Sequence, residues 1–450
     1  MSLRFFFLFL LYFLLLPSVN AEQPSHPFLL GGIQVNEPDH GQWVSALKKR
    51  GFNTVPVTVY AKQGDWHSDN LWWSDREDSV LSEIKEAKKQ GLKVVLILRV
   101  ALDHAFEANK HLWHGMIAPE SPELINSWFE KYKDFANKWA TIAEKEGIDL
   151  FGIGSEMNFL ASTSSLEELP TLIKYYRSRE QQLGRLIRLD QALKNYKGNP
   201  LIKREDLRTD IKSTSAANLD WANRVLGGKK RFSSTVLKNF NQKRKIMDEK
   251  WREVIQGVRT KYRGPLTYAA NFDQYQEVGF WDDLDFIGIN AYFSLRDRET
   301  TGEAKPEQFS EGWKLVWQEI NGFKESKNFK EKPVVFTELG YTRREGSGFE
   351  PWHGFGYSIM GEEEPRIVFQ KAQKTIYTER TMAVQALAKS IQAGQGLLDG
   401  ILYWKFSTKL EHLEIEPFVH VIEDPADTEF QKALFAVKEV SRNSDYLCPF

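Results

Sequence analysis

The chain has 450 residues, of which 42% are apolar and 27% charged, and its formal net charge is −1. This composition supplies a large core and excludes wholesale disorder, and the near-zero charge gives no bulk attraction to nucleic acid. The single cysteine, Cys448, excludes an internal disulfide and a cysteine-based zinc site.

The first 21 residues have the pattern of an export signal. A short positive start is followed by twelve apolar residues, Phe5 to Leu16, and Val19-Asn20-Ala21 fits a cleavage site. Twelve residues are too few to span a bilayer comfortably, although an uncleaved anchor is the alternative. We therefore predict a signal peptide over 1–21 and a secreted or periplasmic protein. No later run reaches about 18 apolar residues, so no transmembrane segment is expected in the mature chain.

Short apolar runs alternate with amphipathic stretches along most of the chain. Strands are predicted over 29–35, 54–60, 93–100, 150–155, 266–270, 285–292, 333–337 and 400–406. Continuous apolar strands separated by helices indicate a parallel sheet buried on both faces. Eight such units favour a closed barrel, and no glycine-rich phosphate loop supports a dinucleotide-binding fold. The predicted fold class is therefore α/β, a (β/α)8 TIM barrel, forming a single domain over 22–450.

Two segments depart from this alternation. Residues from about 160 to 245 predict a mostly helical insertion after the fourth strand, and about 411–450 form a C-terminal extension. The span 174–263 holds 24 Lys and Arg against 9 Asp and Glu, with the densest runs at 229–231 and 243–245. Such asymmetry indicates either an anionic partner, such as an acidic glycan or cell surface, or a helical hairpin paired with the acidic barrel. Nucleic acid is not expected for an exported chain.

Glu156 and Glu338 each follow an apolar strand directly. In α/β barrels the active site lies at the carboxyl ends of the strands, so both side chains are expected in one mouth. A carboxylate there is costly unless it is solvated, paired or used. Retaining glycosidases need such a pair about 5–5.5 Å apart. The alternative is that each Glu is a structural partner of an arginine or an amide.

Several motifs in order along the chain resemble glycoside hydrolase family 113. They cover most of residues 29–410 apart from the insertion, and comprise WHGMI (113–117), the aromatic positions of 128–140, FGIGSE (151–156), YAAN (268–271), FWDDLDFIGINAYF (280–293), PVVFTELGY (333–341) and DGILYW (399–404). The resemblance implies a clan A (β/α)8 barrel in a family whose members include retaining β-1,4-mannanases.

The resemblance also implies roles for single residues. Glu156 matches the acid/base, Glu338 the nucleophile, and Tyr292 the tyrosine that hydrogen-bonds the nucleophile. Trp404 matches the aromatic residue under the sugar at subsite −1, and Arg99 lies where relatives place a basic or polar contact to that sugar.

Ser155 stands where much of clan A has an asparagine that contacts the sugar 2-hydroxyl. Its shorter hydroxyl is still expected to bind substrate, but the sugar specificity is then open. Asn271 and Trp113 are further candidate sugar contacts, although Asn271 is equally suited to holding a loop. His104 and His114 lack the spacing of zinc ligands, so we expect no metal and no cofactor.

These observations predict a retaining hydrolase of a β-linked glycan, with β-1,4-mannan or a manno-oligosaccharide as the first candidate substrate. The acid/base Glu156 should have a raised pKa, partly because the charge of Glu338 lies across the site. Two alternatives stay open: a non-catalytic carbohydrate-binding barrel, and a transglycosidase with the same covalent intermediate.

Overall fold

The fold is described from a computed structural model. It describes residues 27–74, 77–164, 213, 216–225, 233–296, 303–343, 346–352, 357–360, 366–369 and 378–444. The predicted signal peptide and the basic run 229–231 lie outside the described residues.

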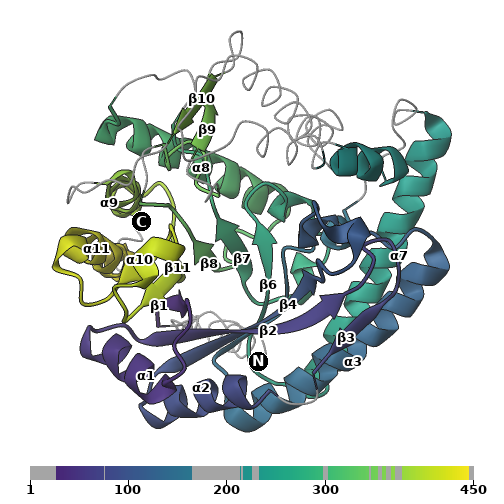
Figure 1. The fold of residues 1–450 in the computed structure, drawn as a ribbon, viewed down its shortest axis with the longest axis horizontal. Coiled ribbons are helices and arrows are strands. Elements are labelled where there is room, and N and C mark those ends of the chain that lie inside the picture. The colour runs from purple at the N-terminus through teal and green to yellow at the C-terminus, as the bar shows by residue number, and fades with distance from the viewer. Residues whose placement is uncertain are drawn as a thin grey trace, which may run out of the picture.

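Eight parallel strands within the described residues close into a barrel, which confirms the predicted fold class (Figure 1). In chain order they are β1 Leu29–Gln34, β2 Thr54–Gln63, β4 Lys93–Leu102, β5 Leu150–Ser155, β6 Leu266–Asn271, β7 Ile287–Ala291, β8 Val334–Leu339 and β11 Gly400–Ser407. The barrel closes where Gly31 of β1 pairs with Thr54 of β2. This pairing involves few residues, so few backbone N–H groups of β2 have to donate to β1. Pro56 of β2, which lacks an N–H, is therefore tolerated at this edge of the strand.

Helices surround the barrel and bury one face each against it (Figure 1). They are α1 His40–Lys49, α2 Asp78–Lys89, α3 Pro122–Glu146, α7 Ser234–Arg259, α8 Pro306–Ser326, α9 Glu379–Gln392 and α11 Thr428–Ser444. The long α3 shows why they begin and end where they do. The Ser121 side chain accepts from the Leu124 N–H, Pro122 opens the first turn, and Gly147 ends the helix at φ +64°.

Short elements complete the connections. They are β3 Leu71–Trp73, η1 Glu107–Asn109, η2 His114–Met116, α4 Asn158–Ala161, η5 Tyr275–Glu277, η6 Trp281–Asp283, β9 Tyr357–Met360, β10 Arg366–Phe369, α10 His412–Ile415, β12 His420–Val421 and η7 Pro425–Asp427. Between β6 and β7 the described chain forms only η5 and η6 rather than a long helix. No helix in the described part of the chain is long and apolar enough to cross a bilayer.

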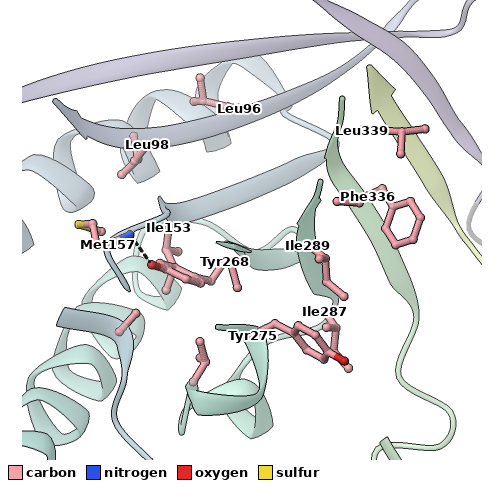
Figure 2. Packing of buried hydrophobic residues seen from close by; sticks show 14 of the residues in the cluster. Leu96, Leu98, Ile153, Met157, Tyr268, Tyr275, Ile287, Ile289, Phe336 and Leu339 are labelled. Carbon is pink, nitrogen blue, oxygen red and sulfur yellow. Dashed lines mark hydrogen bonds between the residues drawn. The ribbon is translucent and has the colours of Figure 1, made fainter. Parts of the chain in front are cut away.

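Side chains along each strand point alternately outward and inward, which divides the core into two layers. The outer layer packs between the strands and the helices, where Figure 2 shows Leu96, Leu98, Ile289 and Phe336. The inner layer fills the barrel and consists of Leu29, Val95, Ile97, Leu150, Ala269, Phe286, Val335 and Leu402. Because side chains two apart share a face, the next residues on this inner face point into the barrel mouth.

The described part of the basic segment is largely paired with acidic groups. Arg224 lies 2.6 Å from Glu120, and Arg259 lies 2.6 Å from Asp285. Arg244 is buried and pairs with Glu277, so it is wrong to count it in an exposed basic surface. These contacts favour the paired hairpin for the described residues, and binding of an anionic surface stays a prediction.

The segment after β11 is integrated with the barrel rather than appended to it. Its helix α11 packs against α9, and β12 adds to β11. Arg380 of α9 is fully buried and forms an ion pair with Asp427 of η7. The described residues 411–444 therefore supply the last helix of the barrel.

Candidate active site

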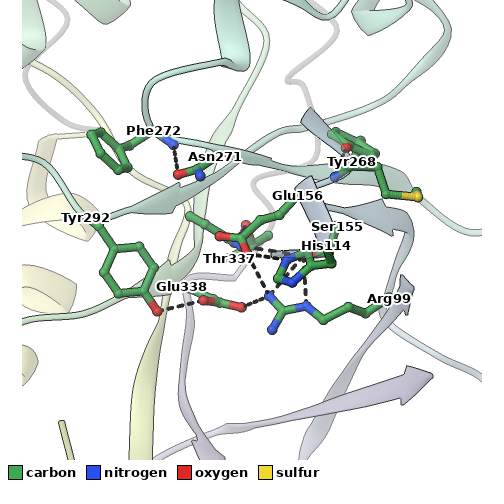
Figure 3. Close-up of polar contacts among 12 residues, drawn as sticks. Arg99, His114, Ser155, Glu156, Tyr268, Asn271, Phe272, Tyr292, Thr337 and Glu338 are labelled. Atoms are coloured by element: carbon green, nitrogen blue, oxygen red, sulfur yellow. Dashed lines mark hydrogen bonds and ion pairs between the residues drawn. The ribbon is translucent and has the colours of Figure 1, made fainter. Parts of the chain in front are cut away.

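The two predicted carboxylates lie together in the barrel mouth (Figure 3). Glu156 directly follows β5, and Glu338 is the second-to-last residue of β8. Both side chains are buried, with 8% and 4% of the residue surface exposed. A register shift between β7 and β8 sets Glu338 opposite Asn290, which lies on the inner face of β7. Such irregularities re-aim a side chain, and here the shift turns the Glu338 carboxylate inward.

Arg99 joins the two carboxylates. It lies on β4 two residues beyond Ile97 of the inner core, so its side chain enters the mouth. Its Nη2 atom hydrogen-bonds to Oε1 of Glu338 and lies 3.6 Å from Oε2 of Glu156. These two oxygens are therefore less than about 6.5 Å apart, since an ordinary hydrogen bond adds about 2.9 Å to the longer contact.

Glu338 has a second donor on its other oxygen. The Tyr292 hydroxyl donates to Oε2 at 2.7 Å. Burial raises the pKa of Glu338 to about 7, while the charge of Arg99 and the Tyr292 hydrogen bond act in the opposite direction. The contact predicted between Tyr292 and Glu338 is thus present.

Glu156 has a different environment. His114 Nε2 lies 2.9 Å from Glu156 Oε2. Burial raises the pKa of Glu156, but the His114 hydrogen bond and the charge of Arg99 outweigh burial and lower the pKa to about 2. The expected raised pKa is therefore wrong, because the two donors that face Glu156 favour its ionised form more strongly than burial opposes it.

The backbone at Glu156 is strained. Its φ is +49°, a left-handed conformation that costs a non-glycine residue about 1 kcal/mol or more. Neighbouring β6 holds the turn in place: the Glu156 N–H donates to the Ala269 carbonyl, and the Met157 N–H donates to the Tyr268 hydroxyl, both at 2.9 Å. Strain supported in this way is characteristic of functional sites.

Ser155 is fully buried beneath the carboxylates. Its hydroxyl accepts from Arg99 Nη2 at 3.0 Å and from Asn290 Nδ2 at 3.4 Å. The Thr337 hydroxyl donates to the other end of the Asn290 amide at 2.8 Å, which orients that amide. Ser155 thus orients Arg99, and direct contact between Ser155 and substrate stays a prediction.

The other predicted substrate contacts lie around this network. Trp404, half-buried two residues beyond Leu402 of the inner core, has its ring centroid 5.3 Å from the Arg99 guanidinium carbon. Trp113 packs edge-on against His114, with ring centroids 5.1 Å apart. Asn271 is the inner-face residue at the end of β6, and its side chain accepts from the Phe272 N–H. Their contacts with substrate stay predictions.

The family model of Glycoside Hydrolase Family 113 matches residues 34–179 and 239–413, more than half of the chain. The chain belongs to glycoside hydrolase family 113. This confirms the resemblance that the motifs indicated.

Solved structures of other family 113 proteins share this fold. The GH113 β-mannanase AaManA from Alicyclobacillus acidocaldarius is 18% identical with a TM-score of 0.53, over 92% of this chain and 97% of that protein. A second GH113 β-1,4-mannanase gives the same identity and TM-score over 92% and 99% of the two chains. Among curated protein sequences none matches.

Four residues of this family 113 site were not predicted from the sequence as functional residues: Tyr60, His114, Asn290 and Lys405. Tyr60 pairs in register with Arg99 and is 44% exposed although it lies within a strand, so it lines the mouth. The Lys405 ammonium lies 3.7 Å from the Trp404 ring centroid, and burial lowers its pKa to about 8. Tyr60 ends the strand predicted over 54–60 and Asn290 lies near the end of its strand, so both were recognisable from position, whereas His114 comes from a loop.

Metal-ligating side chains do not gather in the described part of this family 113 chain. No group of three or more His, Cys, Asp or Glu residues there is arranged to hold a metal ion.

Proposed function

We propose that the chain is a retaining glycoside hydrolase that cleaves β-1,4-linked mannan or manno-oligosaccharides. The observation that carries the proposal is the single Arg99 nitrogen in contact with both Glu156 and Glu338. The bound of about 6.5 Å on their oxygens favours the narrow spacing of retaining enzymes over the roughly 6.5–9.5 Å of inverting ones. Mannan is favoured because solved members of the family are β-mannanases.

In the first step Glu338 attacks the anomeric carbon as the bond to the leaving oxygen breaks. Glu156 gives its proton to that oxygen, and an ester between the sugar and Glu338 results. Arg99 and Tyr292 stabilise the ionised form of Glu338 that attacks. In the second step Glu156 removes a proton from water, which displaces the sugar from Glu338. The predicted signal peptide supports a proposal that the protein acts outside the cytoplasm.

The test uses two substitutions and an activated aryl β-mannoside. Glu338→Ala should abolish turnover, and azide should restore it with inverted product, because the anion occupies the place of the carboxylate. Glu156→Ala should spare glycosylation from a good leaving group but slow deglycosylation, by roughly 10²–10⁴-fold for loss of general base catalysis. Full activity in either variant contradicts the proposal.

Wild-type product analysis separates the remaining alternatives. Hydrolysis products alone favour a hydrolase, while transfer to added sugar acceptors favours a transglycosidase. Binding without any turnover across a panel of aryl β-glycosides and polysaccharides identifies a carbohydrate-binding barrel instead.

A further inference from the structure

His114 is held rigidly beside Glu156. It begins the short helix η2 in the loop between β4 and α3. The Met116 N–H donates to the Trp113 carbonyl at 2.9 Å, and the Trp221 indole donates to the Met116 carbonyl at 2.8 Å. With Trp113 packed edge-on against its ring, the imidazole is directed at Glu156 and its side chain is 23% exposed (Figure 3).

The groups that face Glu156 differ in what they can do with a proton. Arg99 from β4 can only donate hydrogen bonds, and a neutral imidazole can either donate or accept. Tyr268 from β6 and Tyr292 after β7 have pKa values raised by burial, so both phenols stay protonated. His114 is the neighbour that can both give up a proton and take one back, because an imidazole nitrogen is a donor in one form and an acceptor in the other.

This arrangement creates a requirement for the proposed cycle. Glu156 must carry a proton when Glu338 is ionised and attacks. Yet Arg99 and His114 both contact Oε2 of Glu156 and favour its ionised form. A group in direct contact with Glu156 can supply this proton, and the 2.9 Å separation between His114 Nε2 and Glu156 Oε2 is short enough for direct transfer.

We propose that His114 and Glu156 hold one proton between them, with His114 as the positioning residue that supplies and receives it. In glycosylation the N–H bond of the imidazolium breaks as an O–H bond forms on Glu156, and this proton passes to the leaving oxygen. In deglycosylation Glu156 takes a proton from water and returns it to the neutral imidazole. The inference rests on the proposed function, since it assigns the proton supply of that same site.

Two substitutions at His114 separate proton supply from packing. His114→Gln keeps a side chain that can donate a hydrogen bond to Glu156 but cannot give up a proton near neutral pH, whereas His114→Ala removes the donor. The matched control is His104→Gln, because His104 lies on the same loop but its Nε2 contacts the Leu112 carbonyl oxygen. The readout is kcat/KM against pH for aryl β-mannosides with poor and good leaving groups.

With the poor leaving group, the basic limb of His114→Gln should move to lower pH by about one pH unit or more. At a pH above the basic limbs of both the wild type and His114→Gln, each pH unit by which the limb moves corresponds to roughly a tenfold loss of kcat/KM. The loss should shrink with the good leaving group, which needs little acid assistance, and the basic limb of His104→Gln should stay in place. An unmoved limb in His114→Gln, or equal losses for both leaving groups, overturns the proposal.

A second measurement does not depend on activity. Carboxyl ¹³C NMR of Glu156 should show its titration moving to higher pH in His114→Ala, because the donor that stabilises the carboxylate is gone. If the titration of Glu156 is unchanged in His114→Ala, the proposal that His114 and Glu156 share a proton is overturned. A coupled titration in a protein that hydrolyses no β-mannoside would instead retain the pair and reject the proposed function.

Discussion

In the proposed mechanism Glu338 must be ionised to attack, so the Tyr292 hydroxyl should influence the acidic side of the pH profile. Burial raises the pKa of Glu338 to about 7, and the Tyr292 hydrogen bond opposes that rise. Tyr292→Phe should therefore raise this pKa further and move the acidic limb of kcat/KM to higher pH. Below the limb, kcat/KM should fall roughly tenfold for each pH unit by which the limb moves.

The matched control for this prediction is Tyr341→Phe. Tyr341 is also buried, but its hydroxyl donates to the Phe293 carbonyl at 2.9 Å rather than to Glu338. The acidic limb of the kcat/KM profile of Tyr341→Phe should therefore not move. A Tyr292→Phe profile that overlays the wild-type limb would show that the hydroxyl does not influence Glu338.

At the scale of an element, the turn that ends β5 holds Glu156 in its left-handed conformation. Tyr268→Phe removes the acceptor of the buried Met157 N–H, at a cost of about 1–3 kcal/mol in the free energy of unfolding. Because this turn positions Glu156, kcat/KM should fall as well. Chemical denaturation and kinetics with a poor leaving group measure the two effects.

Tyr132→Phe on α3 provides the comparison, because the Tyr132 side chain also contacts β5. Its buried hydroxyl donates to the Ile153 carbonyl of β5 at 2.7 Å, away from the turn. Similar destabilisation with a smaller loss of kcat/KM is expected. If both variants lose activity in proportion to stability, the turn has no separate role in positioning Glu156.

At the scale of the whole molecule, a buried ion pair ties the C-terminal segment to the barrel. Arg380 also donates to the Phe418 and Val419 carbonyls at 3.1 and 2.9 Å. Arg380→Gln leaves Asp427 buried without its main partner, so the free energy of unfolding should fall by about 3–5 kcal/mol. The measurement is denaturant unfolding near neutral pH.

The control is a more exposed pair between α7 and the segment that precedes β7. Arg259→Gln removes the ion pair with Asp285 and should cost only about 0–1 kcal/mol. Equal losses in the two variants would mean that the Arg380 pair does not anchor the C-terminal segment.

The sequence by itself determined the barrel and the position of both carboxylates. Continuous apolar runs mark strands buried on both faces, and a parallel barrel brings their carboxyl ends to one mouth. Glu156, Glu338, Tyr292, Arg99 and Trp404 were therefore identifiable as mouth residues from local pattern and family resemblance. Each lies within or directly after a strand, so the strand end that it occupies follows from the pattern. The inward direction of Glu338 depends in addition on the register shift between β7 and β8.

Only the tertiary structure decided the electrostatics of the site. The contact of His114 with Glu156 joins residues 42 apart, and that of Arg99 with Glu338 joins residues 239 apart. The opposite pKa shifts of the two carboxylates depend on these contacts, because a pKa responds to burial and to the charges and donors within a few ångströms. Sequence spacing predicts which strand end a side chain occupies, but a loop residue such as His114 is placed only by the packing of its loop.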